Sequence, residues 1–132
     1  MSDNNHMNYF ISWKQLPFLD ITFNIIIKII PEIIKSKFKL EKWGFVISNY
    51  DNYLHIEKLS SPIIYCKTSD KPFTKDVMRV LIIMFEYNVV ENLSISRNDM
   101  TWFLEALDEV NKIHPLLSYD VQKEYFIKLN LK

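Results

Sequence analysis

Apolar and polar residues alternate along much of the first half of the chain, as they do in β-strands with one buried face. This alternation predicts strands over residues 8–14, 45–50, 53–59 and 62–68. Asp51 and Asn52 tolerate left-handed backbone, so they predict a two-residue hairpin loop between the second and third strands. The loop would pair Ile47 with Ile56 on the apolar face, and the 62–68 strand would complete a small antiparallel meander.

Residues 18–34 fit two patterns, and the pattern alone leaves strand or helix open for 18–30. Apolar residues alternate with polar ones from Ile21 onward, but isoleucines also recur at helical spacing. Branching at Cβ favours a strand as far as Ile30, and Pro31 suits the first turn of a helix. We therefore predict a helix near 31–43 that ends at Gly44, the single glycine.

The second half has the 3.6-residue period of amphipathic helices. We predict a central buried helix over 75–87 with Thr74 as its N-cap, and an extended connector over 88–95. A third helix would run over 97–113, capped by Ser96 with Asp99 in the capping-box position. A last helix would begin at Ser118, and its inward residues would be Val121, Tyr125, Phe126 and Leu129.

Together these elements predict one α+β domain spanning residues 1–132. In it, a small antiparallel sheet from the N-terminal half packs against about three C-terminal helices, plus one helix near 31–43. Residues 1–7 are polar, and Met7 follows His6 like a second start, so we expect 1–7 to lie outside the folded domain.

Composition narrows the class of protein. Of 132 residues, 48% are hydrophobic and one is cysteine, which argues against a disordered chain and against a disulfide scaffold. The start lacks the pattern of a secretory signal, so we expect a cytoplasmic protein. The apolar run from Ile25 to Ile34 is too short to span a membrane, so we expect no membrane association.

The residues that carry most metal and cofactor chemistry are few and scattered. Cys66, His6, His55 and His114 contain no closely spaced pair of the kind that zinc sites use, so we predict no metal. A single glycine argues against a phosphate-binding loop, so we predict no cofactor. We interpret Cys66 as a core residue.

One catalytic alternative remains on the hairpin. The predicted register places Ser48 beside His55 on the face that also carries Glu57, and these are the residue types of a hydrolase triad. No Gly-x-Ser-x-Gly turn accompanies them to expose the serine. A small hydrolase is therefore the weaker hypothesis, and we expect the protein not to be an enzyme.

Charge is divided between the two halves of the chain. Residues 1–80 carry a net charge of +3 and residues 81–132 a net charge of −3. Four lysines lie close to Phe38 and Trp43, an arrangement that can follow a phosphate backbone: Lys35, Lys37, Lys39 and Lys42. With two arginines in the whole chain, however, the sequence disfavours nucleic acid as a partner.

The acidic half predicts a docking surface for a cationic protein. The candidate partner-binding residues are Glu86, Glu91, Asp99, Trp102, Glu105, Asp108 and Glu109. We interpret the chain as a non-enzymatic protein-binding module, specifically a cytoplasmic immunity or antitoxin protein that neutralises a cationic, nuclease-type toxin by direct binding. The alternatives are a phage or viral accessory protein that binds a host factor, and a secretion chaperone. The oligomeric state is left open.

Overall fold

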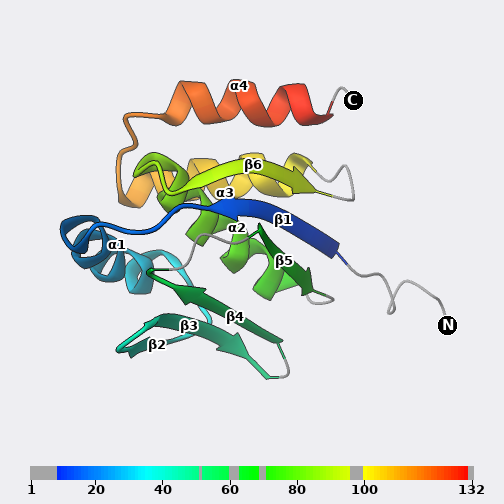
Figure 1. Cartoon of the computed structure of the whole chain (residues 1–132). Helices are drawn as coiled ribbons and strands as arrows, with labels where there is room; N and C mark the ends of the chain where they lie inside the picture. The colour runs from blue at the N-terminus through cyan, green and yellow to red at the C-terminus, as the bar shows by residue number, and fades with distance from the viewer. Residues whose placement is uncertain (1–8, 51, 60–62, 69–70, 96–99, 131–132) are drawn as a thin grey trace, which may run out of the picture.

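The structure is a computed structural model that describes residues 9–50, 52–59, 63–68, 71–95 and 100–130. The predictions for residues 1–7, for the Ser96 cap and for Asp99 lie outside the described residues. The elements, in chain order, are β1 (Tyr9–Gln15), α1 (Asp20–Ile33), β2 (Lys37–Glu41), β3 (Gly44–Asn49), β4 (Asn52–Glu57), β5 (Ile63–Thr68), α2 (Lys71–Glu86), β6 (Val90–Ile95), α3 (Met100–Ile113) and α4 (Tyr119–Asn130) (Figure 1).

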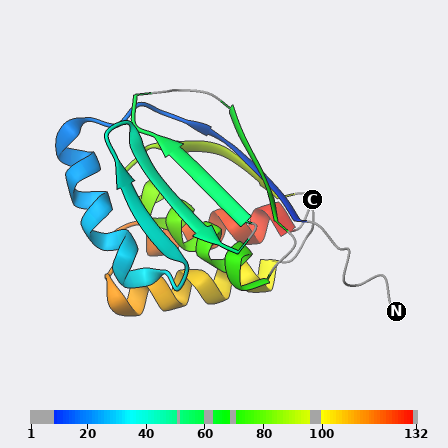
Figure 2. The same cartoon turned by 90° about the horizontal axis from the view of Figure 1, so that it is seen from below.

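The strands form two separate antiparallel sheets, and the α+β class is confirmed. Sheet A has the order β5-β1-β6 and sheet B the order β2-β3-β4. Helices α2, α3 and α4 lie on the same side of the two sheets, while α1 lies at one end of them (Figure 2). The predicted 62–68 strand exists as β5, but it pairs with β1 instead of completing a meander with β4.

Helix α2 is the centre of the core, as its pattern predicts. All eight residues from Val77 to Met84 are buried, including Arg79. The helix begins at Lys71 rather than after Thr74, because Pro72 is readily accommodated in a first helical turn. Thr74 is instead buried inside the helix, where its hydroxyl lies 2.5 Å from that of Thr68 and ties α2 to β5.

The predicted helix near 31–43 is wrong, because the helix occupies Asp20–Ile33 instead. Its buried residues Ile26, Ile30 and Ile33 show that helical spacing prevailed over β-branching, since burial of a whole apolar face outweighs intrinsic propensity. Pro31 lies in the last turn, where it removes the one bond that an N–H at this position would donate to the Ile27 carbonyl, and the helix ends two residues later. Residues 37–41 form strand β2.

Gly44 begins β3 instead of ending a helix. A Cβ atom at this position would overlap the backbone carbonyl oxygen of Ile56 on the paired strand. The single glycine of the chain is therefore required by the close approach of two strands.

The β3-β4 hairpin turns one residue earlier than predicted. Asn49 pairs with Asn52 and Ile47 with Leu54, and Tyr50 takes a left-handed φ of 50°. The shift moves the register by two residues, which preserves the predicted division into an apolar and a polar face.

The predicted connector over 88–95 also contains strand β6, which pairs with β1.

Hydrogen bonds join the two sheets at one end. The Gln15 side chain at the end of β1 donates to the carbonyl of Glu57, and the Phe18 N–H donates to the carbonyl of Lys58 over 2.7 Å.

On α4 the inward residues include Gln122 and Phe126, whereas Val121, predicted to face inward, is 61% exposed. In the described part of the chain, every helix is too short or too polar to cross a bilayer.

Candidate functional site

The acidic candidates on α3 lie on one outer side of the molecule, next to two cations of α2. The Lys75 ammonium lies 3.1 Å from a carboxylate oxygen of Glu105 and 3.3 Å from one of Glu109. The Arg79 guanidinium lies 2.7 Å from Glu109. Much of the charge of Glu109 is therefore balanced within the chain.

The pKa of Glu109 reflects these contacts. Partial burial acts to raise the pKa of this carboxyl, but hydrogen bonding and the positive charge of Arg79, followed by Lys75, outweigh burial and lower the pKa below its ordinary value of 4.5. Glu109 is consequently ionised at neutral pH and acts mainly inside the molecule.

Glu105 and Asp108 are held differently, because among the described residues each contacts a partner through one oxygen. Glu105 accepts from Lys75 through Oε1. Asp108 accepts a 2.5 Å hydrogen bond from the Tyr119 hydroxyl through Oδ1, and this bond raises the pKa of Tyr119. Both carboxylates are exposed and one turn apart on the helix. They form a preorganised acidic pair.

Two further acidic candidates, Glu86 and Glu91, lie on other elements than this pair. Glu86 at the end of α2 accepts hydrogen bonds from the N–H groups of Leu117 and Ser118 at 3.0 and 2.9 Å, and so fixes the start of α4. Glu91 is exposed on β6. Trp102 is half-buried and packs against the core.

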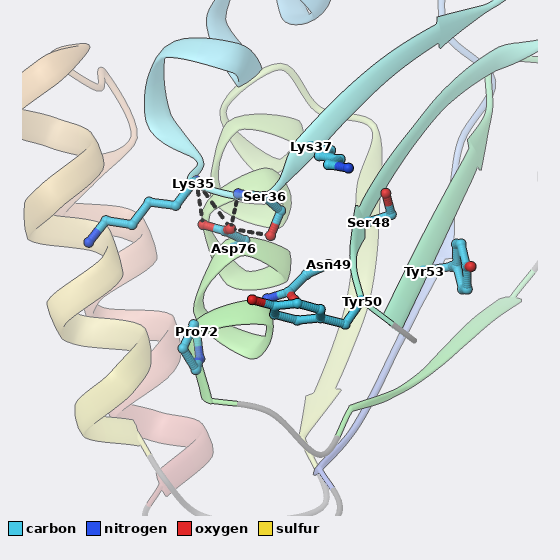
Figure 3. A pocket seen from close by; sticks show the side chains of 9 residues that line it. All are labelled: Lys35, Ser36, Lys37, Ser48, Asn49, Tyr50, Tyr53, Pro72 and Asp76. Atoms are coloured by element: carbon cyan, nitrogen blue, oxygen red, sulfur yellow. Dashed lines mark hydrogen bonds between the residues drawn. The ribbon is translucent and has the colours of Figure 1, made fainter.

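A buried ionic network lies beneath these residues. Asp76 is 1% exposed and accepts hydrogen bonds from the N–H groups of Lys35 and Ser36, from the Ser36 hydroxyl and from Arg79 (Figure 3). Arg79 in turn reaches Glu109 on α3. The network connects the segment after α1 with α2 and α3, and its carboxylate is fully occupied, so we assign it to the fold.

Sheet B presents a second candidate site on the face turned away from the core, which we call the outer face. On this face Lys37 lies in register with Ser48 and Tyr53, and Lys39 lies in register with Val46 and His55. Trp43, in the turn between β2 and β3, stacks on the His55 ring at a centroid distance of 5.7 Å and an interplanar angle of 10°. The Tyr53 ring lies 6.3 Å from His55, which makes a row of three rings.

A hollow lies at each end of this row. The smaller, about 260 Å³, is lined by Trp43, His55 and Glu57. The larger, about 570 Å³, is lined by Lys35, Ser36, Lys37, Ser48, Asn49, Tyr50, Tyr53, Pro72 and Asp76. Figure 3 shows the Tyr50 ring close to Pro72 and Asn49, while the Lys35 side chain extends away from Asp76. Tyr53 therefore borders one hollow and His55 the other.

The catalytic alternative gains no support from this geometry. His55 lies opposite Val46, while Ser48 lies opposite Tyr53, and the imidazole stacks on Trp43. Cys66 is buried, and desolvation raises the pKa of its thiol to about 11, as expected for a core cysteine. Within the described ranges, no three His, Cys, Asp or Glu residues gather as metal ligands would.

Comparisons with known proteins give no relative: no family model matches the chain, and neither a curated protein nor a solved structure does. The fold defines the class as a small α+β protein with two antiparallel sheets, and function has to be inferred from its own surfaces.

The sequence pattern did not predict that Trp43, His55 and Tyr53 form one row on the outer face. The signals were present, because Tyr53, His55 and Glu57 alternate along one strand and the predicted faces are right. The error came from predicting residues 31–43 as a helix. In a helix Lys37 and Lys39 would point in different directions, whereas in strand β2 they lie beside these rings.

Proposed function

We propose that the protein is a non-enzymatic binding module that recognises a cationic protein through the Glu105–Asp108 pair. An immunity or antitoxin role, in which the chain covers a nuclease-type toxin, is the specific form of this proposal. It is supported by one observation: two exposed carboxylates one turn apart are each fixed through one oxygen, and no other described residue contacts their second oxygens.

Fixing the carboxylates before binding matters energetically. Each immobilised flexible side chain costs about 0.5–1.5 kcal/mol on association, and here Lys75 and Tyr119 have already ordered both groups. The second oxygen of each carboxylate is suited to an arginine or lysine of the partner. Half-buried Trp102, one turn before Glu105, adds aromatic area of the kind that anchors interfaces.

The proposal is tested by charge reversal followed by partner capture. Wild-type chain, the Glu105→Lys/Asp108→Lys variant and a Glu124→Lys control on α4 are immobilised, and basic proteins retained from the native host are quantified. We expect a protein retained by wild type and the control but reduced at least tenfold by the double variant. For the purified partner, association should be slower with the variant and less dependent on salt.

Equal retention on all three chains would contradict the proposed surface, provided that circular dichroism shows the double variant folded. For the immunity role, co-expression of the chain must also suppress the toxicity of the captured protein. A partner without toxicity would leave the binding role and remove the immunity role.

A further inference from the structure

We infer that the outer face of sheet B binds single-stranded nucleic acid, with bases stacked on its row of rings and phosphates paired with the lysines of β2. This surface is separate from the Glu105–Asp108 pair, so the inference goes beyond the proposed function and can fail without it.

The rings are placed as a stacking surface requires. Trp43 is 39% exposed, Tyr53 61% and Tyr50, at the hairpin turn, 91%. Exposure of this many large rings is costly for a soluble surface, and Trp43, His55 and Tyr53 form a continuous row rather than scattered positions. Aromatic side chains on an antiparallel sheet can stack with bases of any sequence, because every base has a π-face.

The lysines of β2 and of the adjoining turn are positioned to pair with phosphates. Lys37 and Lys39 lie two residues apart on β2, about 7 Å along the strand, directly across β3 from Tyr53 and His55. Lys42 is exposed in the turn that carries Trp43. The same face also carries Glu41 and Glu57, both in register with Gly44, and Glu41 pairs with Lys39 at 3.5 Å.

The hollows indicate a single strand in preference to a duplex. A base that has left a stack can enter the hollow of about 570 Å³, which the Ser48 hydroxyl and the Tyr50 ring both line (Figure 3). Bases inside a duplex are stacked on one another and cannot reach the rings.

The inference is tested by fluorescence anisotropy with a labelled twelve-nucleotide uridine RNA, the thymidine DNA of equal length and a labelled duplex of the same length. At low salt we expect both single strands to bind with Kd below about 100 µM and the duplex at least tenfold more weakly. The Trp43→Ala/Tyr53→Ala variant should lose at least about fivefold per ring, since stacking contributes about 1–3 kcal/mol per base.

Two further variants separate phosphate pairing from nonspecific attraction. Lys37→Gln/Lys39→Gln should reduce the slope of log affinity against log salt by about 1.4, since each single-strand phosphate contact contributes about 0.7. Lys123→Gln/Lys128→Gln on α4 changes the net charge equally and should leave binding unchanged. The ring variant must keep the wild-type far-ultraviolet circular dichroism, and Trp43→Phe/Tyr53→Phe, which retains aromatic faces, should restore most of the affinity.

Several outcomes would overturn the inference. They are absence of single-strand binding at 100 µM protein, duplex binding as tight as single-strand binding, and no effect of the ring variant. Competition by polyglutamate as strong as that by unlabelled RNA at equal charge would assign the face to an acidic protein instead. Any of these leaves the test at Glu105 and Asp108 unaffected, because no residue is shared between the two surfaces.

Discussion

At the scale of single residues, the environment of a side chain decides its chemistry more than its type does. Glu109 and Glu105 lie four residues apart on α3, yet Glu109 is held by both Arg79 and Lys75, while Glu105 pairs with Lys75 through one oxygen. The sequence shows both as equivalent members of an acidic face. Only the position of α2 against α3 distinguishes them.

Cys66 gives a prediction at this scale. Because burial raises the pKa of its thiol to about 11, almost no thiolate exists at neutral pH. The sulfur is also buried, so a thiol reagent in solution reaches it only when the fold opens. We expect Ellman's reagent to modify native protein at pH 8 at least about a hundredfold more slowly than a free thiol. In 6 M guanidinium chloride the reaction should become fast, and fast reaction of the native protein would contradict the buried site.

At the scale of elements, the helix and strand periods conflict in one segment. Residues 21–33 match both, and burial of Phe23, Ile26 and Ile30 against the rest of the core favours the helix. Predicting a strand up to Ile30 also made the next element wrong, because the following residues, which include β2, were then predicted as the helix. The local pattern cannot distinguish a helix from a strand here, because both periods place isoleucines on one face.

Gly44 is a position where β3 and β4 come very close to each other. Gly44→Ala should lower the free energy of unfolding by at least about 2 kcal/mol, because the new Cβ would overlap the Ile56 carbonyl oxygen and force β3 away from β4. Ser94→Ala, an exposed change on β6, is the control and should stay within about 0.5 kcal/mol. Urea denaturation measures both, and equal stability of the two variants would show that the strands separate freely at Gly44.

At the scale of the whole molecule, the buried network joins parts that are distant in sequence. Asp76 binds the backbone after α1 and the guanidinium of Arg79, and Arg79 reaches α3. Both side chains are more than nine-tenths buried, so loss of Arg79 removes the cation that Asp76 pairs with, and loss of Asp76 leaves Glu109 as the remaining carboxylate on Arg79. The contribution of the network is therefore coupled rather than additive.

We expect Asp76→Ala to destabilise the protein by about 3–5 kcal/mol, because two buried backbone N–H groups lose their acceptor and the buried Arg79 keeps only Glu109 of its two carboxylate partners. Asp76→Ala/Arg79→Met should cost clearly less than the sum of the single changes, since the double variant removes both charges. Glu124→Ala, from the exposed pair with Lys128, should change stability by no more than about 0.5 kcal/mol. Additive single changes would contradict the coupling.

The sequence by itself determined what depends on period and local chemistry. It predicted the α+β class, strands near 8–14 and 62–68, the buried helix at α2 and the two faces of the hairpin, because each follows from residues a few positions apart. The candidate sites were less accessible. The residues of the Glu105–Asp108 pair were identified, but Lys75 and Tyr119, which hold them, were not.

The tertiary structure alone decided the rest. Contacts between residues thirty or more positions apart, such as Lys75 with Glu105 or β1 with β5, leave no periodic trace, because they depend on how whole elements pack. Strand pairing split the expected single sheet into two, and the outer face of sheet B gained its lysines only when β2 formed beside β3. Long-range packing therefore fixed which charges are balanced internally and which remain for a partner.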